Sequence, residues 1–195
     1  FKNISTLINK ICLSNFVGKD FLDNLDEIFS RSPEGLSQGY CASGQSEAVD
    51  KIVKSIWTTN KKSNRFITFD GHYFGSGSFC ARTISNIDEP LFSVDRLKNP
   101  TEDNYKSVLD DINLLLEANK YLAVFIEAKR QKFMDNIPLH FLDELRKMLS
   151  KYNTPLVVNE TASKLGQYSS DFYASSNMKS PPDAIMAYFG GQIAV

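Results

Sequence analysis

The segments S-G-Q-S-E-A-V-D, residues 43–50, and F-D-G-H-Y-F-G, residues 69–75, decide the fold of this chain. Apolar side chains begin within the first segment and recur at the three- and four-residue spacing of one helix face. They are Val49, Ile52, Val53, Ile56 and Trp57. Residues 66–69 then have the pattern of a short buried strand. The sequence therefore predicts a helix followed by a strand whose carboxyl end carries an aromatic turn.

The predicted helix begins among small and hydroxyl residues, which is the composition of a capped helix start. Unpaired backbone N–H groups and the positive end of the helix dipole attract anions there, and Gly44 lets a phosphate approach the backbone closely. Tyr73 lies in the turn after the strand, at the edge where ligands of open α/β sheets bind. The pattern predicts a phosphate seat beside an aromatic ring. The alternatives are an ordinary N-cap and a core aromatic.

Helix and strand patterns alternate along the rest of the chain. Helices are expected at residues 20–30, at 104–119 and along Phe141, Leu142, Leu145, Met148 and Leu149; strands are expected at 122–126 and 155–158, and residues 192–195 are strand-like. A long connection follows residue 69, and residues 163–180 are expected to be a polar, mobile segment. This alternation predicts an α/β fold with a mostly parallel sheet flanked by helices.

Composition limits the classes of function. A chain of 195 residues with 42% hydrophobic content suits one globular domain over residues 1–195, and its formal charge of −1 argues against nucleic-acid binding. No apolar run reaches membrane-spanning length, so no membrane partner is expected. Three cysteines, Cys12, Cys41 and Cys80, lack metal-ligand spacing and suit a reducing, cytoplasmic interior. With two histidines a His-rich metal site is not expected, and His72 is interpreted as a hydrogen-bonded turn residue rather than a base.

Six segments together carry a family resemblance. In order they are S-G-Q-S-E-A-V-D, F-D-G-H-Y-F-G, A-V-F-I-E (123–127), I-P-L-H-F-L-D-E-L-R (137–146), L-V-V-N-E (156–160) and P-D (182–183). This set resembles the class III pyridoxal-phosphate aminotransferases, and the resemblance spans nearly the whole chain. It implies the large domain of a fold-type I transferase and the cofactor pyridoxal phosphate.

The resemblance also implies a cofactor site. Its residues would be Gly44, Gln45 and Ser46 at the phosphate, Tyr73 stacked on the pyridine ring, Glu127 at the family's strand-ending glutamate and Asn159 at the pyridine nitrogen. Local departures accompany these matches. The family's S-G-S-E-A appears with an additional glutamine, and the histidine after its aromatic is Phe74. Its P-x-Q-G-x-G-G run is replaced after Glu127 by residues 128–132, a basic loop with three cationic side chains.

Three further departures concern the chemistry. The family aspartate at the pyridine nitrogen is Asn159, which hydrogen-bonds but supplies no negative charge. Ala162 replaces the glutamine that reaches the phenolic oxygen of the cofactor. Six residues beyond Asp183, where the family has its Schiff-base lysine, stands Phe189. Because Lys164 and Lys179 are interpreted as surface residues, no substitute amine and no catalytic residue are expected.

Two hypotheses follow. The first is a catalytically degenerate aminotransferase-like domain that serves as a scaffold, a dimerisation element or a noncovalent ligand-binding module, with pyridoxal phosphate bound noncovalently or lost. The second is an active enzyme that transfers an amino group to a 2-oxo acid or aldehyde, with its lysine supplied elsewhere. A third interpretation makes the basic run 129–132 a docking surface. The expected partners are a second copy in a homodimer or other domains of a longer polypeptide, because the family's small carboxyl-terminal domain is not in the sequence.

Overall fold

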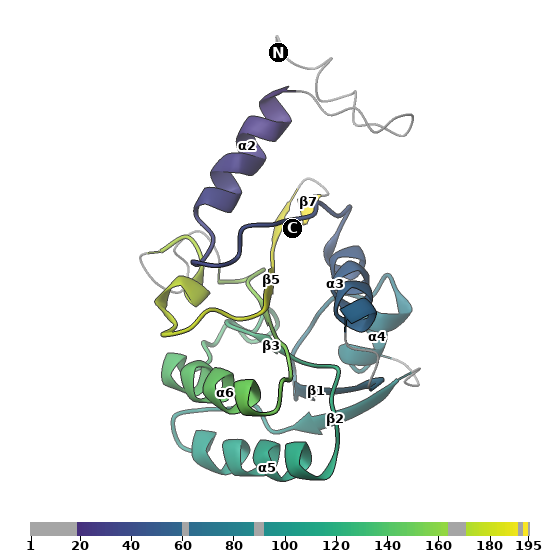
Figure 1. Ribbon diagram of the computed structural model, residues 1–195, viewed down its shortest axis with the longest axis vertical. Coiled ribbons are helices and arrows are strands. Elements are labelled where there is room, and N and C mark those ends of the chain that lie inside the picture. Colours follow the sequence, from purple (N-terminus) through teal and green to yellow (C-terminus); the bar gives the residue numbers. More distant parts are fainter. Residues whose placement is uncertain (1–18, 60–62, 88–91, 164–170, 191–192, 195) are drawn as a thin grey trace.

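A computed structural model of the chain describes residues 19–59, 63–87, 92–163, 171–190 and 193–194 (Figure 1). The helices are α2 (Lys19–Ser30), α3 (Gln45–Thr59), α4 (Phe79–Ile84), α5 (Tyr105–Ala118), α6 (Leu139–Lys151) and the 3-10 helix η1 (Ala174–Asn177). The strands are β1 (Arg65–Phe69), β2 (Ser93–Leu97), β3 (Ala123–Glu127), β4 (Leu156–Asn159), β5 (Ala184–Met186), β6 (Tyr188–Gly190) and β7 (Ile193–Ala194).

Five strands form one sheet in the order β2-β1-β3-β4-β5, and every neighbouring pair in it is parallel. The chain moves outward from β1 to β2 on one side and from β3 through β4 to β5 on the other. The direction of winding therefore reverses between β1 and β3. In open α/β sheets this reversal opens a crevice outside the carboxyl ends of the two strands, where ligands bind.

Helices cover both faces of the sheet, with α5 and α6 together on one face and α3 and α4 on the other (Figure 1). Successive strand residues point to opposite faces, so that Ile67 packs with the α5 and α6 side and Phe66 packs with the α3 and α4 side. All residues of β3 are buried, as expected of a central parallel strand. The predicted α/β fold is confirmed.

The predicted helices and strands lie within two residues of their observed positions, but one side chain differs. Trp57, placed on the buried face of its helix by periodicity, is 48% exposed. The last buried residue of α3 is Val53, one turn earlier. The apolar face predicted by periodicity thus continues past the part of the helix that the sheet covers.

The expectation of a polar, mobile segment at residues 163–180 is also wrong in part. Residues 164–170 lie outside the described part of the chain. Beyond them Tyr173 is buried at the start of η1, and Ser175 is 1% exposed. The fully buried Glu160 carboxylate accepts the backbone N–H of Ser175 at 2.8 Å and also its hydroxyl. Ser163 and Ser175 therefore serve a buried carboxylate, while the polar residues at 176, 177, 179 and 180 are exposed.

The sequence did not reveal α4 and β2, which fill the long connection after β1. At the carboxyl end, β6 and β7 pair in antiparallel fashion. Of the strand-like residues 192–195, Ile193 and Ala194 form β7, and the other two lie outside the described residues. Within the part of the chain that the structure describes, no helix has the length and apolar character needed to cross a membrane.

Candidate functional site

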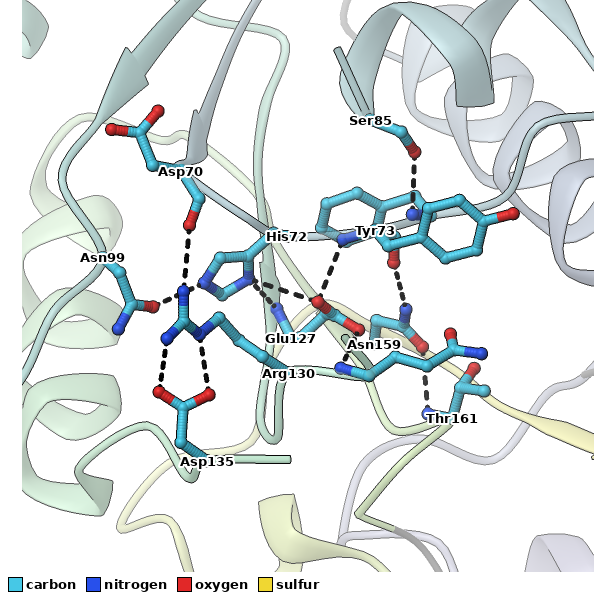
Figure 2. A network of polar contacts seen from close by, with 12 residues as sticks. Asp70, His72, Tyr73, Ser85, Asn99, Glu127, Arg130, Asp135, Asn159 and Thr161 are labelled. Atoms are coloured by element: carbon cyan, nitrogen blue, oxygen red, sulfur yellow. Dashed lines mark hydrogen bonds and ion pairs between the residues drawn. The ribbon is translucent and has the colours of Figure 1, made fainter. Parts of the chain in front are cut away.

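The buried carboxyl group of Glu127 lies at the centre of a polar network at the carboxyl edge of the sheet (Figure 2). Glu127 ends β3, and one of its side-chain oxygens accepts the backbone N–H of Tyr73 at 2.9 Å. The other oxygen accepts the backbone N–H of Gln131 at 3.0 Å. Burial raises the pKa of Glu127 to about 7, against the opposing effect of these two N–H groups and of Arg130. The carboxyl group joins the turn after β1 to the turn after β3.

His72 is hydrogen-bonded within the same network. Its Nδ1 accepts the backbone N–H of Glu127 at 2.9 Å, so the ring carries its hydrogen on Nε2, which lies 2.9 Å from the Asn99 side-chain oxygen. Burial lowers the pKa of His72 to about 4, and the ring is neutral at neutral pH. Its approach to the Glu127 carboxyl group at 3.9 Å is therefore not an ion pair. The prediction that His72 is a hydrogen-bonded turn residue is confirmed.

Asn159 ends β4 and is the register neighbour of Glu127. Its amide nitrogen donates to the carbonyl oxygen of Tyr73 at 3.0 Å, and its amide oxygen accepts the backbone N–H of Thr161 at 2.9 Å. Tyr73 is consequently held at its N–H by β3 and at its carbonyl by β4 (Figure 2). One amide hydrogen of Asn159 remains beyond these two bonds.

The start of α3 supplies unpaired donors. Gly44 precedes the helix, and the Glu47 carboxylate folds back to accept the backbone N–H and the hydroxyl of Ser43 at 2.6 and 2.7 Å. The hydrogen bonds from Ser43 lower the pKa of Glu47 to about 2. Within the described residues, the backbone N–H groups of Gln45, Ser46 and Glu47 make no hydrogen bond. This arrangement is that of an anion-binding helix end.

The aromatic turn packs directly on this helix start. The backbone N–H of Gly77 donates to the Ser46 hydroxyl at 2.8 Å. Gly75 has φ +103°, and a Cβ atom there would lie 2.4 Å from the Ser46 hydroxyl oxygen and 3.0 Å from the Ser46 nitrogen. Only glycine fits this conformation and this approach. The start of α3 and the turn that carries Tyr73 are therefore in contact. We call these two features together the seat, with the helix start and the aromatic turn as its two halves.

The basic residues after Glu127 form a tight turn, residues 129–136, that we call the basic turn. Lys129 and Asn136 pair across it, and the Arg130 guanidinium binds both oxygens of Asp135. The exposed ring of Phe133 lies 4.2 Å from the Arg130 guanidinium carbon, measured to the ring centroid. This pair covers Gly71, where an added Cβ would lie 2.7 Å from the Phe133 ring. The basic turn is thus built against the aromatic turn.

Two side chains of the basic turn reach the two halves of the seat. The Lys132 ammonium nitrogen lies 5.7 Å from the centroid of the Tyr73 ring. The Gln131 side-chain oxygen lies 3.5 Å from the amide nitrogen of Gln45, which also donates to the Thr161 hydroxyl at 3.2 Å. Gln131, Lys132 and Thr161 were not assigned to the site from sequence. The basic composition of residues 129–132 is the available signal, and it allows both a docking surface and a solvated loop.

The structure brings together the sequence-predicted residues Gly44, Gln45, Ser46, Tyr73, Glu127 and Asn159 through the contacts above. Ala162 is buried in the turn after β4. Phe189 lies in β6, and Lys164 lies outside the described residues. Lys179 is exposed, with its backbone N–H bonded to Asp143 of α6 at 2.8 Å. Among the described residues, no cluster of three or more His, Cys, Asp or Glu side chains is placed to hold a metal ion.

The fold of this chain is similar to that of solved transaminase structures. A transaminase from the marine bacterium Virgibacillus superposes with a TM-score of 0.80 at 16% identity, over 95% of this chain and 45% of that one. The omega transaminase from Pseudomonas jessenii, in complex with PMP, superposes with a TM-score of 0.79 at 15% identity, over 98% of this chain and 50% of that one. The fold is that of the transaminases.

Sequence comparison supports this aminotransferase-like fold. The chain is 27% identical over 179 residues to the adenosylmethionine-8-amino-7-oxononanoate aminotransferase of Aquifex aeolicus, covering 77% of this chain and 39% of that protein. No protein-family model matches the sequence. The aminotransferase-like chain thus spans well under two thirds of its curated relative and about half of the solved transaminases. The predicted resemblance to aminotransferases is confirmed.

Proposed function

We propose that this aminotransferase-like chain binds a phosphorylated pyridine ring of the pyridoxal phosphate class between the start of α3 and Tyr73, and that it is catalytically degenerate as a class III transaminase. The supporting observation is that two features lie close together. The start of α3 has backbone N–H groups without hydrogen bonds within the described residues, and the nearby Tyr73 has its own backbone N–H and carbonyl both hydrogen-bonded. Both lie at the carboxyl edge of the sheet, where the direction of winding reverses between β1 and β3.

The residues present fit such a ligand in three respects. The N–H groups of residues 45–47 and the Ser46 hydroxyl hydrogen are donors for a phosphate. The half-buried Tyr73 ring offers a flat surface for a second aromatic ring. The remaining amide hydrogen of Asn159 is a donor for a pyridine nitrogen. These groups bind and orient the ligand, which when bound would supply an electron-withdrawing ring and an aldehyde.

The same residues argue against transamination. Amino transfer requires an amine that both activates the aldehyde and moves a proton, and the family position for it holds Phe189. Asn159 leaves the pyridine nitrogen without the negative charge that keeps it protonated. The buried Glu127 carboxyl group is committed to two backbone N–H groups. We therefore infer that the chain is a ligand-binding module. An active aminotransferase is the alternative function that the experiment below distinguishes from it.

Pyridoxamine phosphate tests this proposal, because it carries the ring and the phosphate but no aldehyde. We expect saturable binding by isothermal calorimetry, weakened by excess inorganic phosphate and by Tyr73→Ala by about tenfold, the loss of one aromatic contact. Tyr40→Ala is the matched control, since Tyr40 is 72% exposed. Absence of binding would refute the proposal. Conversion of bound pyridoxamine phosphate by an added 2-oxo acid would instead identify an active aminotransferase.

Three expectations from sequence stay predictions. Association with a second copy or with other domains is tested by sedimentation of the chain with and without pyridoxamine phosphate. The single-domain organisation is tested by one cooperative unfolding transition. The cytoplasmic location is tested by fractionation of the source cells.

A further inference from the structure

We propose that Lys132 captures the aldehyde of the ligand bound at this seat, forming a Schiff base at a position unrelated to residue 189. This inference rests on the proposed function, because the phosphate and ring must first be held beside the basic turn. It adds a covalent anchor to that function.

The first observation is the position of the amine. The Lys132 nitrogen lies 5.7 Å from the Tyr73 ring centroid. A ring that stacks on a tyrosine has its centroid about 4.5 to 7 Å away, so the amine lies in the shell that the ligand would occupy. Lys132 is exposed, and its flexible stem lets the amine move from the ring face to the ring margin.

The second observation is that this amine is not engaged elsewhere. Among the described residues Lys132 forms no ion pair or hydrogen bond, and its one recorded contact is with the Tyr73 ring. Two other cations near the seat are paired, Lys51 with Glu47 at 3.1 Å and Arg130 with Asp135. No carboxylate partner must be displaced before Lys132 reacts.

The third observation is that the backbone beside Lys132 is fixed. The N–H of Gln131 is bonded to the buried Glu127 carboxyl group, which also binds the N–H of Tyr73. The basic turn is closed behind Lys132 by the Arg130 and Asp135 pair. A single carboxyl group therefore sets the spacing between the amine-bearing turn and the aromatic ring, while the lysine side chain remains free to move.

The fourth observation is that consecutive residues reach both halves of the seat. The Gln131 side chain approaches Gln45 at the helix start, and Lys132 approaches Tyr73. A ligand with its phosphate at the helix start and its ring on Tyr73 would lie alongside this dipeptide. Proximity of this kind raises the effective concentration of one amine above that of the other surface lysines.

The reaction balances without another reactant. The Lys132 amine, after losing a proton to solvent, attacks the aldehyde carbon and forms a carbon–nitrogen double bond, while the carbonyl oxygen leaves as water. No oxidant or reductant takes part, and water reverses the step. Borohydride, added as a reagent, delivers a hydride to this bond and leaves a stable secondary amine on the lysine.

The experiment treats the full chain with pyridoxal phosphate at less than one equivalent, reduces it with borohydride and maps the modified lysines by mass spectrometry. We expect labelling of Lys132 about tenfold above that of Lys129, the matched lysine of the same turn, because proximity favours one amine. Excess inorganic phosphate, or pyridoxal without its phosphate, should abolish this preference. Lys132→Arg keeps the positive charge beside Tyr73 and should lose the label, whereas Lys129→Arg should keep it.

The outcomes separate the two proposals. Binding of pyridoxamine phosphate without preferential labelling of Lys132 overturns the Schiff base and leaves the binding function standing. Preferential labelling of another lysine has the same meaning. Failure of pyridoxamine phosphate to bind, together with even labelling of surface lysines, overturns both. Circular dichroism of Lys132→Arg confirms that loss of label is not loss of fold.

Discussion

The side-chain amide of Asn159 donates to the backbone carbonyl of Tyr73 across 3.0 Å. This bond joins the carboxyl end of β4 to the turn after β1, although β3 lies between the two strands in the sheet. It gives Asn159 a structural role that is independent of any ligand. An aspartate at this position would therefore change both the electrostatics of the seat and the way its aromatic turn is held.

Asn159→Asp is expected to destabilise the chain, although aspartate is the residue of the resembled family. A carboxylate cannot donate to the Tyr73 carbonyl, and it would stand beside the buried Glu127 carboxyl group, its register neighbour. Loss of this donor should lower the free energy of unfolding by about 1–3 kcal/mol. Urea unfolding measures the change. Asn136→Asp, in the exposed basic turn, is the control, and equal stability of the two variants would contradict the structural role.

Gly75→Ala should cost more stability than Gly35→Ala. Both residues have positive φ, +103° and +91°, so both substitutions strain the backbone by about 1–2 kcal/mol. Only at Gly75 would the new Cβ meet Ser46, since nothing lies within 4 Å of that position at Gly35. The difference between the melting temperatures isolates the contact between the aromatic turn and the helix start. Pyridoxamine phosphate binding should fall in Gly75→Ala and not in Gly35→Ala.

The dependence of stability on pH should contain two opposing contributions. The pKa of Glu127 is about 7 in the fold against an ordinary 4.5, so the folded state holds its proton longer and stability falls as pH rises from about 4.5 to 7. The pKa of His72 is about 4 against an ordinary 6.5, so stability rises between about 4 and 6.5. The two effects oppose each other between about 4.5 and 6.5.

Glu127→Gln separates these contributions. The variant loses a hydrogen-bond acceptor, which lowers stability at every pH, and it also loses the titration of the carboxyl group. Its free energy of unfolding should therefore rise with pH from about 4 to 6.5 more steeply than that of the parent chain. Urea titrations at several pH values measure both curves. Parallel curves would show that Glu127 titrates in its ordinary range.

Glu160→Gln is expected to loosen the segment that contains η1. The Glu160 carboxylate accepts hydrogen bonds from the hydroxyls of Ser163 and Ser175 and from the N–H groups of Ala174 and Ser175. An amide has one acceptor oxygen in place of two, so buried donors lose their partner at a cost of about 1–3 kcal/mol. Hydrogen exchange at Ala174 and Ser175 should accelerate while that of β3 stays unchanged. Uniform acceleration across both would indicate global destabilisation instead.

Elements with a strong local pattern could be predicted from the sequence, and elements stabilised by distant partners could not. Helix α5 repeats its apolar residues over four turns, and β3 is a continuous apolar run. Strand β2, in contrast, contains the charged residues Asp95 and Arg96, which are more typical of a loop than of a buried strand. Asp95 accepts the Tyr121 hydroxyl at 2.6 Å, and Arg96 binds the carbonyl of Ile84 at 2.8 Å. Because these partners are distant in sequence, no local sequence pattern predicts the strand.

The same distinction holds at the seat. Tyr73, Glu127 and Asn159 each follow a recognisable strand, so their meeting at one edge follows from parallel topology. The approach of Lys132 to Tyr73 depends instead on how the basic turn folds back over Gly71. Turn geometry of this kind is set by the Arg130 and Asp135 pair and by close packing, which composition does not encode.

The two hydrogen bonds of the Tyr73 backbone, with Glu127 and with Asn159, have a consequence for how such chains evolve. Glu127 and Asn159 hold the aromatic turn in place through the protein's own backbone, so removing either one weakens the fold before it affects any ligand. Selection for a folded chain is then enough to preserve the shape of the seat, whether or not a reaction takes place there. An intact seat of this construction records a requirement for stability, and its persistence is no measure of whether a reaction still takes place there.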